Sequence, residues 1–357
     1  MKIAFFVSSL LSAYWNGAAT YYRGLIKALH NRGHTITVYE PDAYERQQHR
    51  DLNAPTWARV IVYSNDQDAA LHAVERARRE ADMIVKASGI GVFDQLLEAA
   101  VLDAKRPQNQ IVYCDVDAPA TLERIENNPD DPFRPLIPRY DFIFTYGGGS
   151  PVVRRYDALG ARLCVTIYNG LDRETHYPVQ PQSRFRADLG FLGHRLPDRE
   201  ARVHEFFVDP AEQLPDREFL LGGIGWDSSA LPPNIKNVGH VYTTDHNAFN
   251  CSPQAVLNVS RASMARFGFS PATRVFEAAG AAACLITDAW IGIDQFFEPG
   301  EEILVAHTGE EVAAHIVDLT PERARQIGQA AYRRALAQHT YAHRAAQLDE
   351  ILEGAFA

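Results

Sequence analysis

Three side chains of different chemistry share one predicted helix face in the second half of the chain. Ser270, Arg274 and Glu277 are spaced four and three residues apart, which places them on one side of a helix. Ser270 is a favourable N-cap and Pro271 suits the first helical position, so we predict that a helix begins at Ser270. The backbone N–H groups at such a start attract an anion. A cation and a carboxylate next to an anion site indicate a ligand that has phosphate and hydroxyl groups.

A second loop with similar chemistry follows another predicted strand. Residues 188–192 predict a strand, and Gly193-His194-Arg195 come directly after it. The backbone of this loop can approach a phosphate closely, and the guanidinium of Arg195 can pair with it. Simpler interpretations exist, because Arg195 and Arg199 can be surface arginines and Glu277 can pair with Arg274.

Two aspartates follow a strand in the first half of the chain. Residues 110–114 predict the strand, and Asp115 and Asp117 come after it. Two carboxylates at this spacing could hold a divalent metal, bind sugar hydroxyls or supply a general base. The Asp-Ala-Pro sequence also favours an ordinary turn. These alternatives stay open on the residues alone.

Several familiar catalytic and cofactor signatures are missing from the sequence. The first strand–loop–helix unit lacks G-x-G-x-x-G, and its loop carries Asn16-Gly17-Ala18 instead. Gly147 to Gly149 are not followed by the Lys and Ser/Thr of a P-loop. The histidines show no metal-ligand spacing, and no Ser-His-Asp elbow is present. ATP hydrolysis and dinucleotide chemistry are therefore unsupported.

Strand and helix patterns alternate along both halves of the chain, which predicts a parallel sheet in each. Polar and glycine residues follow the strands at the sheet edge where ligands bind in such folds. The pattern loosens at 168–181, where we place a domain crossover. We predict strands at 2–8, 35–39, 60–63, 83–87, 110–114, 141–146, 188–192, 218–221, 238–241, 255–259, 284–287 and 302–306, and helices at 18–31, 68–81, 93–102, 120–126, from 151, 200–207, from 270, from 308 and from 321 to the end.

Length and composition limit the classes of protein that fit. The 357 residues, 46% of them hydrophobic, suffice for two domains with separate cores. The net charge of -10 disfavours a nucleic-acid partner. No apolar run approaches the roughly 20 residues that cross a bilayer, and the four cysteines are far apart. We therefore expect a cytoplasmic protein with reduced cysteines and no transmembrane segment.

The sequence resembles the spore-maturation-protein-like (CgeB-like) glycosyltransferases over nearly its whole length. The most specific block covers residues 269–280, 285–288 and 294–304, and residues 15–25 and 115–119 resemble motifs of the N-terminal half. The resemblance implies the α/β GT-B fold, with two doubly wound Rossmann-like domains that face a cleft. It implies an acceptor domain at 1–170, a nucleotide-sugar domain at 171–334, and a final helix at about 335–357 that returns to the first domain.

The resemblance also implies roles for individual residues. Glu277 would bind ribose hydroxyls, Arg195 would bind the diphosphate, and Asp117 would serve the acceptor or the transferred sugar, with Asp117 and Glu277 as the catalytic candidates. The remaining expected donor contacts are Gly17, Gly193, Gly239, His240, Val241, Phe269, Ser270, Pro271 and Arg274. No metal and no cofactor besides the nucleotide-diphosphate sugar are expected.

One position departs from the pattern of the wider class. Many members have two acids seven residues apart; the second matches Glu277, and the first would fall at Phe269, which is not an acid. The leading hypothesis is a glycosyltransferase of the retaining type with an unknown acceptor. A non-catalytic nucleotide- or sugar-binding protein and a nucleotide-sugar epimerase are the alternatives.

Overall fold

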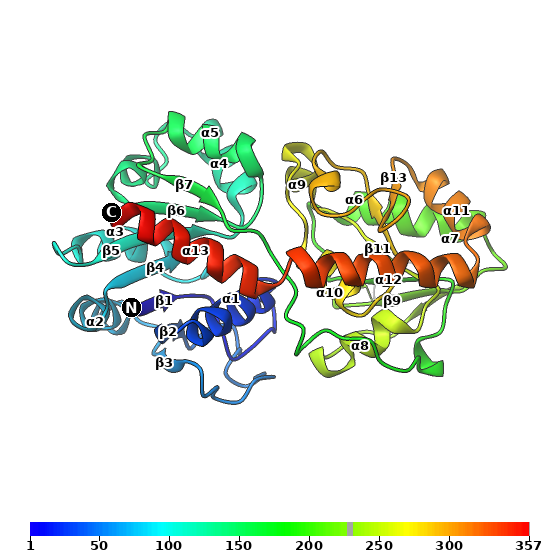
Figure 1. The fold of residues 1–357 in the computed structure, drawn as a ribbon, viewed down its shortest axis with the longest axis horizontal. Coiled ribbons are helices and arrows are strands. Elements are labelled where there is room, and N and C mark those ends of the chain that lie inside the picture. The colour runs from blue at the N-terminus through cyan, green and yellow to red at the C-terminus, as the bar shows by residue number, and fades with distance from the viewer. Residues whose placement is uncertain (227–230, 357) are drawn as a thin grey trace. The chain divides into compact units, whose positions relative to one another are not determined.

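The computed structural model describes residues 1–226 and 231–356, which fold into two compact α/β units. The first unit comprises Met1–Tyr168 and Tyr341–Ala357, and the second comprises Asn169–Thr340. The chain therefore leaves the first unit once and returns to it for its last helix, as the colour sequence in Figure 1 shows. Each unit is described separately below.

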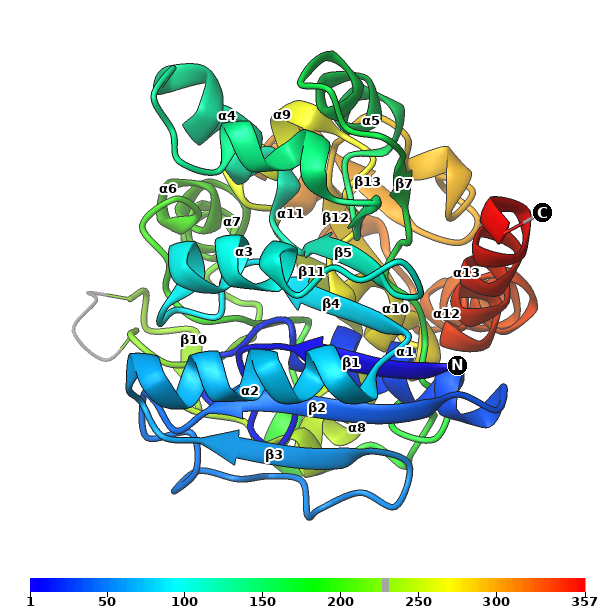
Figure 2. The same cartoon turned by 90° about the vertical axis from the view of Figure 1, so that its left-hand side faces the viewer.

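The first unit is built on a seven-stranded parallel sheet in the order β3-β2-β1-β4-β5-β6-β7. β1 is central, and its Phe5 pairs in register with Val38 and Val85 of the two neighbouring strands. Figure 2 shows this sheet with α2 beside it. The strands are β1 (Lys2–Phe6), β2 (Thr35–Pro41), β3 (Arg59–Tyr63), β4 (Met83–Ala87), β5 (Gln110–Asp115), β6 (Phe142–Thr145) and β7 (Cys164–Thr166), and the helices are α1 (Ala19–Asn31), α2 (Gln67–Glu80), α3 (Asp94–Asp103), α4 (Ala118–Asn127), α5 (Gly149–Ala158) and α13 (Tyr341–Phe356).

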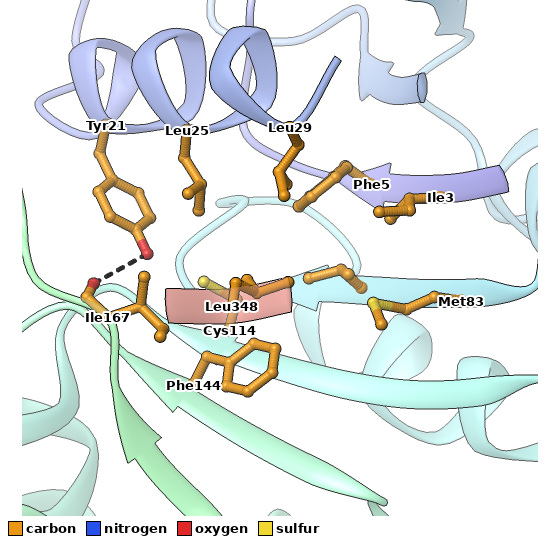
Figure 3. A pocket seen from close by; sticks show the side chains of 11 residues that line it. Ile3, Phe5, Tyr21, Leu25, Leu29, Met83, Cys114, Phe144, Ile167 and Leu348 are labelled. Carbon is orange, nitrogen blue, oxygen red and sulfur yellow. Dashed lines mark hydrogen bonds between the residues drawn. The ribbon is translucent and has the colours of Figure 1, made fainter. Parts of the chain in front are cut away.

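The returning helix α13 packs against α1 on the first unit. Gly24 of α1 makes this close approach possible, because a Cβ there would lie 2.0 Å from the ring of Tyr341. Beneath the two helices lies a small cavity lined by apolar side chains (Figure 3). Tyr21 at its edge donates its hydroxyl hydrogen to the carbonyl oxygen of Ile167 at 3.1 Å. The cavity is part of the core and offers a polar ligand no partners.

The second unit has a six-stranded parallel sheet in the order β10-β9-β8-β11-β12-β13. Its register joins Leu257 to Phe191 and Ile286 across adjacent strands. The strands are β8 (Leu189–Leu192), β9 (Phe219–Gly222), β10 (Ile235–Asn237), β11 (Ala255–Asn258), β12 (Leu285–Asp288) and β13 (Leu304–Ala306), and the helices are α6 (Glu200–Val203), α7 (Asp209–Gln213), α8 (Thr243–Cys251), α9 (Ala262–Phe267), α10 (Thr273–Gly280), α11 (Gly309–Asp318) and α12 (Pro321–Gln338).

Several predicted elements need correction. The strand predicted at 238–241 is wrong, because β10 ends at Asn237 and 238–241 is irregular. The helix predicted at 200–207 is α6 followed by a π-helical turn. The long helical tail is two helices, because His339 and Thr340 leave the helical conformation and Thr340 forms a bridge with Leu171. The prediction also omitted β7, α8 and α9, which are short or weakly periodic.

The structure bears on two predictions, one about membrane-spanning segments and one about the cysteines. None of the described helices is long and apolar enough to cross a membrane. The four cysteines, Cys114, Cys164, Cys251 and Cys284, are free thiols. Burial raises the pKa of the Cys114 and Cys284 thiols to about 12, so these two are inert core residues.

Candidate functional site

Two glycine loops lie against each other at the carboxyl edge of the second unit's sheet. Gly193 follows β8, and Gly223 follows β9. Gly223 has φ +131°, and a Cβ there would lie 2.1 Å from the carbonyl oxygen of Gly193. A Cβ on Gly193 would lie 2.8 Å from a terminal nitrogen of Arg199. Glycine is therefore required at Gly223, while at Gly193 the missing side chain leaves room for the guanidinium of Arg199 beside the loop.

Arg199 and Arg274 form the electrostatic centre of this edge. The pKa of Arg199 falls from 12.5 to about 10, first because of burial and then because of the charge of Arg274. The pKa of Arg274 is also lowered by burial, while Glu277 opposes that shift. The ion pair of Arg274 with Glu277 is long, with 4.0 Å between the guanidinium and the carboxylate. Two half-buried cations whose charges repel one another make a site that an anion would stabilise.

Two histidines lie beside these arginines. The rings of His194 and His240 are nearly parallel, with centroids 6.3 Å apart. The Nδ1 atom of His194 accepts a hydrogen bond from the backbone N–H of Ile224 at 3.1 Å. Burial, His240 and Arg199 together lower the pKa of His194 to about 4. His194 is therefore neutral at pH 7, and its ring adds polar surface without adding charge.

The helix start next to the arginines differs from the prediction. α10 begins at Thr273 with Ala272 as N-cap, so the predicted N-cap at Ser270 is wrong by two residues. Ser270 is buried and its hydroxyl donates to the carbonyl oxygen of Gly268 at 2.9 Å. The carbonyl of Pro271 accepts from the side-chain amide of Asn169 at 2.9 Å. These bonds hold the loop in an irregular conformation, and no side-chain cap occupies the start of α10.

Phe269 is held in a left-handed backbone conformation with φ +48°. Its N–H donates to the carbonyl oxygen of Ile291 at 2.6 Å. Its ring lies where a Cβ on Gly292 would come within 2.2 Å. Packing of two loops thus fixes the strained conformation, which is uncommon for a bulky residue and recurs at functional sites.

Arg195 lies in a different environment from Arg199. Its guanidinium is 2.6 Å from the carboxylate of Glu200, and both side chains are at least one-third exposed. Exposed pairs of this kind contribute little to stability. Arg195 is thus engaged at the surface, while the half-buried Arg199 is more strongly desolvated, as its lowered pKa shows.

The remaining expected residues of the second unit lie in two places. Gly239 has φ +66°, and its N–H donates to the side chain of Asn237 at 2.9 Å. His240 is exposed and stands edge-on to Tyr242, with ring centroids 4.5 Å apart. Val241 is buried and packs with Leu192 and Phe249. Glu277 is 5% exposed on α10, one turn from its start.

The two aspartates of the first unit have separate roles. Asp115 is fully buried and accepts hydrogen bonds from the hydroxyls of Tyr156 at 2.5 Å and Thr121 at 3.1 Å. It also accepts from the N–H of Asp117 at 3.0 Å. Asp115 is therefore an internal anchor for the turn, and Asp117 is the half-buried carboxylate at the start of α4.

Gly17 lies in the exposed loop between β1 and α1, and a Cβ there would meet no atom within 4 Å. Its backbone conformation does not demand glycine, so the residue leaves open space at this edge of the first sheet. Within each unit the expected residues thus lie at carboxyl edges of strands or at helix starts. The sequence prediction undervalued Arg199, His194 and His246, whose only signal was their position after strands or in a short helix.

Comparison with known proteins bears on this arrangement. Residues 199–350 match the model of a protein family described as "Glycosyl transferase-like". Over the whole chain the fold matches a sucrose-phosphate synthase from Thermosynechococcus elongatus, with a TM-score of 0.73, 13% identity, and coverage of 100% of this chain and 99% of that one. The fold is GT-B. The predicted fold class is confirmed, and the prediction of a glycosyltransferase-type enzyme is confirmed at the level of the family match.

Two further solved structures are similar along their full length. HepE from Anabaena, determined with UDP-glucose, has a TM-score of 0.70 and 16% identity, with coverage of 99% of this chain and 100% of that one. An α-glucosyltransferase, determined with UDP and a 13-mer DNA, has a TM-score of 0.72 and 11% identity, with coverage of 99% of both chains. A search of curated proteins gave no significant match. At these identities the likeness establishes the fold, and the activity rests on the family match and the site.

Proposed function

We propose that this GT-B protein transfers a sugar from a nucleoside-diphosphate donor to an acceptor, and that it is CgeB-like and retaining. The observation that carries the proposal is the pair of half-buried, mutually repelling cations Arg199, just before α6, and Arg274, at the uncapped start of α10. A diphosphate supplies the missing negative charge. The residues lie within the segment that matches a glycosyltransferase family.

The proposed donor contacts follow from the chemistry of each group. Arg199 and Arg274 donate to diphosphate oxygens together with backbone N–H groups of the Gly193 loop and the start of α10. The same groups stabilise the charge that develops on the leaving diphosphate. The buried carboxylate of Glu277 accepts from ribose hydroxyls. The turn at Gly239, His240 and Val241 contacts the base.

The remaining expected residues keep their proposed roles. The loop at Phe269, Ser270 and Pro271 supplies backbone groups to the sugar or the diphosphate. Gly17 is the proposed diphosphate neighbour from the first unit, and Asp117 is the proposed group for the acceptor or the transferred sugar. No metal takes part in the proposed transfer step. UDP-sugars are the first donors to test, because HepE and the α-glucosyltransferase were determined with UDP-glucose and UDP.

A ligand panel tests the proposal directly. UDP, GDP, ADP and dTDP are added to the full chain, and the melting temperature is measured. We expect at least one to raise it by mass action, and the absence of any shift would contradict the proposal. The corresponding nucleotide sugar is then incubated with and without candidate acceptors, and hydrolysis, transfer and epimerisation products are analysed.

Two variants separate an enzyme from a binding protein. Glu277→Ala and Asp117→Ala should each lose turnover, and Asp117→Ala should keep nucleotide binding because its proposed role is toward the acceptor or the transferred sugar. Binding without turnover for every acceptor supplied would favour the non-catalytic alternative. That alternative is favoured by one observation, namely that Phe269 stands where many relatives of this fold class have an acid.

A further inference from the structure

Two histidines and a glutamate gather in the second unit. His176, His246 and Glu277 each offer one ligand atom, and these atoms lie within 4.8 Å of one another. The three residues come from different segments: His176 is in the irregular segment that opens the second unit, His246 is on α8, and Glu277 is on α10. Their convergence could not be seen in the sequence, where they are separated by 70 and 31 residues.

His176 is buried with its ring nitrogens unsatisfied. It is 1% exposed, and neither Nδ1 nor Nε2 makes a hydrogen bond to any described residue. Buried polar atoms are nearly always hydrogen-bonded, because an unsatisfied one loses its hydration without compensation. A buried imidazole whose ring nitrogens have no hydrogen-bond partner indicates that a ligand binds to them.

The protonation of His246 is fixed by its one backbone contact. Its Nε2 lies 3.3 Å from the carbonyl oxygen of Val241. A carbonyl can only accept, so Nε2 carries the hydrogen and the buried Nδ1 is left with a lone pair that can accept or ligate. Nδ1 has no hydrogen-bond partner among the described residues. Metal-ligating histidines have this arrangement, with one ring N–H donated to a carbonyl and the other nitrogen on the metal.

We propose that His176, His246 and Glu277 bind one divalent transition-metal ion, of which Zn²⁺ is the best match. Two imidazoles and one carboxylate are a zinc ligand set with a fourth position open to water. Mg²⁺ and Ca²⁺ prefer oxygen ligands. Zinc bonds of about 2.0–2.2 Å place ligand atoms roughly 3.5 Å apart, so side-chain adjustments of about an ångström close the site.

The ion would hold three separate segments together at the carboxylate of Glu277. This site shares Glu277 with the proposed donor site. The two uses are compatible, because one oxygen of Glu277 can ligate the ion while the other accepts from a hydroxyl. The guanidinium of Arg274, 4.0 Å from Glu277, opposes a cation. Binding therefore requires all three ligands, and removal of either histidine should abolish it.

Metal content of the full chain tests the proposal. The protein, purified without a polyhistidine tag, is stripped with EDTA, loaded with Zn²⁺ or Co²⁺ and desalted. The metal per chain and the visible absorption of the Co²⁺ form are then measured. His246→Ala and His176→Gln remove one ligand each, and His72→Ala removes an exposed histidine of α2 as the matched control.

We expect the unsubstituted chain and His72→Ala to keep about one ion each and to gain thermal stability on loading. The two ligand variants should bind at least tenfold more weakly. The proposal would be overturned if the unsubstituted chain retained no metal, which is the result expected when water fills the site. Full retention of metal by His246→Ala would also overturn it. If His176→Gln does not fold, the metal content of His246→Ala decides the result, because His246 is only half-buried. Nucleotide-induced melting shifts measured in EDTA report on the proposed transferase independently.

Discussion

Arg199 offers the sharpest test of the site, because its substitution should change stability and binding in opposite directions. Its pKa falls from 12.5 to about 10, and each pKa unit corresponds to about 1.4 kcal/mol. The cost of keeping this guanidinium charged is therefore about 3 kcal/mol at most. Arg199→Met removes the charge and keeps most of the side-chain stem. It also loses the hydrogen bond to the carbonyl of His194, which contributes about 1 kcal/mol.

The expected net result is a rise of about 1–2 kcal/mol in the free energy of unfolding without ligand. For a unit of this size that corresponds to a melting temperature about 2–8 °C higher. Nucleotide binding should weaken, because a charged hydrogen bond contributes about 1.5–3 kcal/mol. The dissociation constant should increase roughly 10- to 100-fold. Thermal melting and titration calorimetry with the nucleotide from the panel measure the two effects on the same preparation.

Arg195→Met is the matched control. Arg195 pairs with Glu200 at the surface, so its loss should change stability by less than about 1 kcal/mol and leave nucleotide affinity nearly unchanged. Two outcomes would refute the reasoning. Arg199→Met could leave affinity unaltered while lowering the melting temperature, or Arg195→Met could weaken binding more than Arg199→Met does.

Three other changes test separate parts of the structure. The folded pKa of His194 is about 4, below the ordinary 6.5, so the unfolded chain takes up its proton first on acidification. The resulting stabilisation, about 3 kcal/mol at most, is complete above pH 6.5 and is lost as the pH falls to 4. Urea unfolding at several pH values should show that the free energy of unfolding depends less steeply on pH in His194→Gln. Gly223→Ala should lower the free energy of unfolding by about 2–4 kcal/mol, because Gly223 has a positive φ and a Cβ there would make a 2.1 Å contact. Gly33 has φ +94° without crowding, so the control Gly33→Ala should cost about 1 kcal/mol. Equal losses in thermal melts would contradict this. Asp115→Asn should destabilise the first unit by about 1–3 kcal/mol, because it weakens the buried hydrogen bonds of Asp115. The nucleotide-induced melting shift should stay unchanged, and an altered shift would assign Asp115 to the site.

The alternation of strands and helices was predictable because buried parallel strands are nearly continuous apolar runs. Residues 83–87 and 255–258 are examples, since each is fully buried. The errors occur where tertiary contacts decide the conformation. Thr340 leaves the helical tail because it pairs with Leu171, a partner far away in the sequence. A propensity-based prediction sees only the good helix formers on both sides of it.

The start of α10 shows the same limit at the site. Ser270 and Pro271 form a favourable capping sequence, but their polar groups bind Gly268 and Asn169 instead. Both alternatives satisfy the same groups, so the sequence alone could not choose between them. The importance of Arg199 for the candidate site could not be predicted from the sequence for a related reason. Its burial depends on Gly193 lacking a side chain and on Arg274, 75 residues later, arriving at the same place.

Phe269 connects these observations to the question of donor recognition. Its backbone is held in the left-handed region by the hydrogen bond to Ile291, and its ring requires Gly292 to lack a Cβ. The loop therefore keeps its shape through packing, with no carboxylate needed to hold it. Under the proposed function, the transferred sugar would then be recognised mainly by backbone groups of this loop. Backbone amides and carbonyls bind hydroxyls without distinguishing them as sharply as a placed acid does, so tolerance toward several sugars is the physical consequence of an apolar residue at this position.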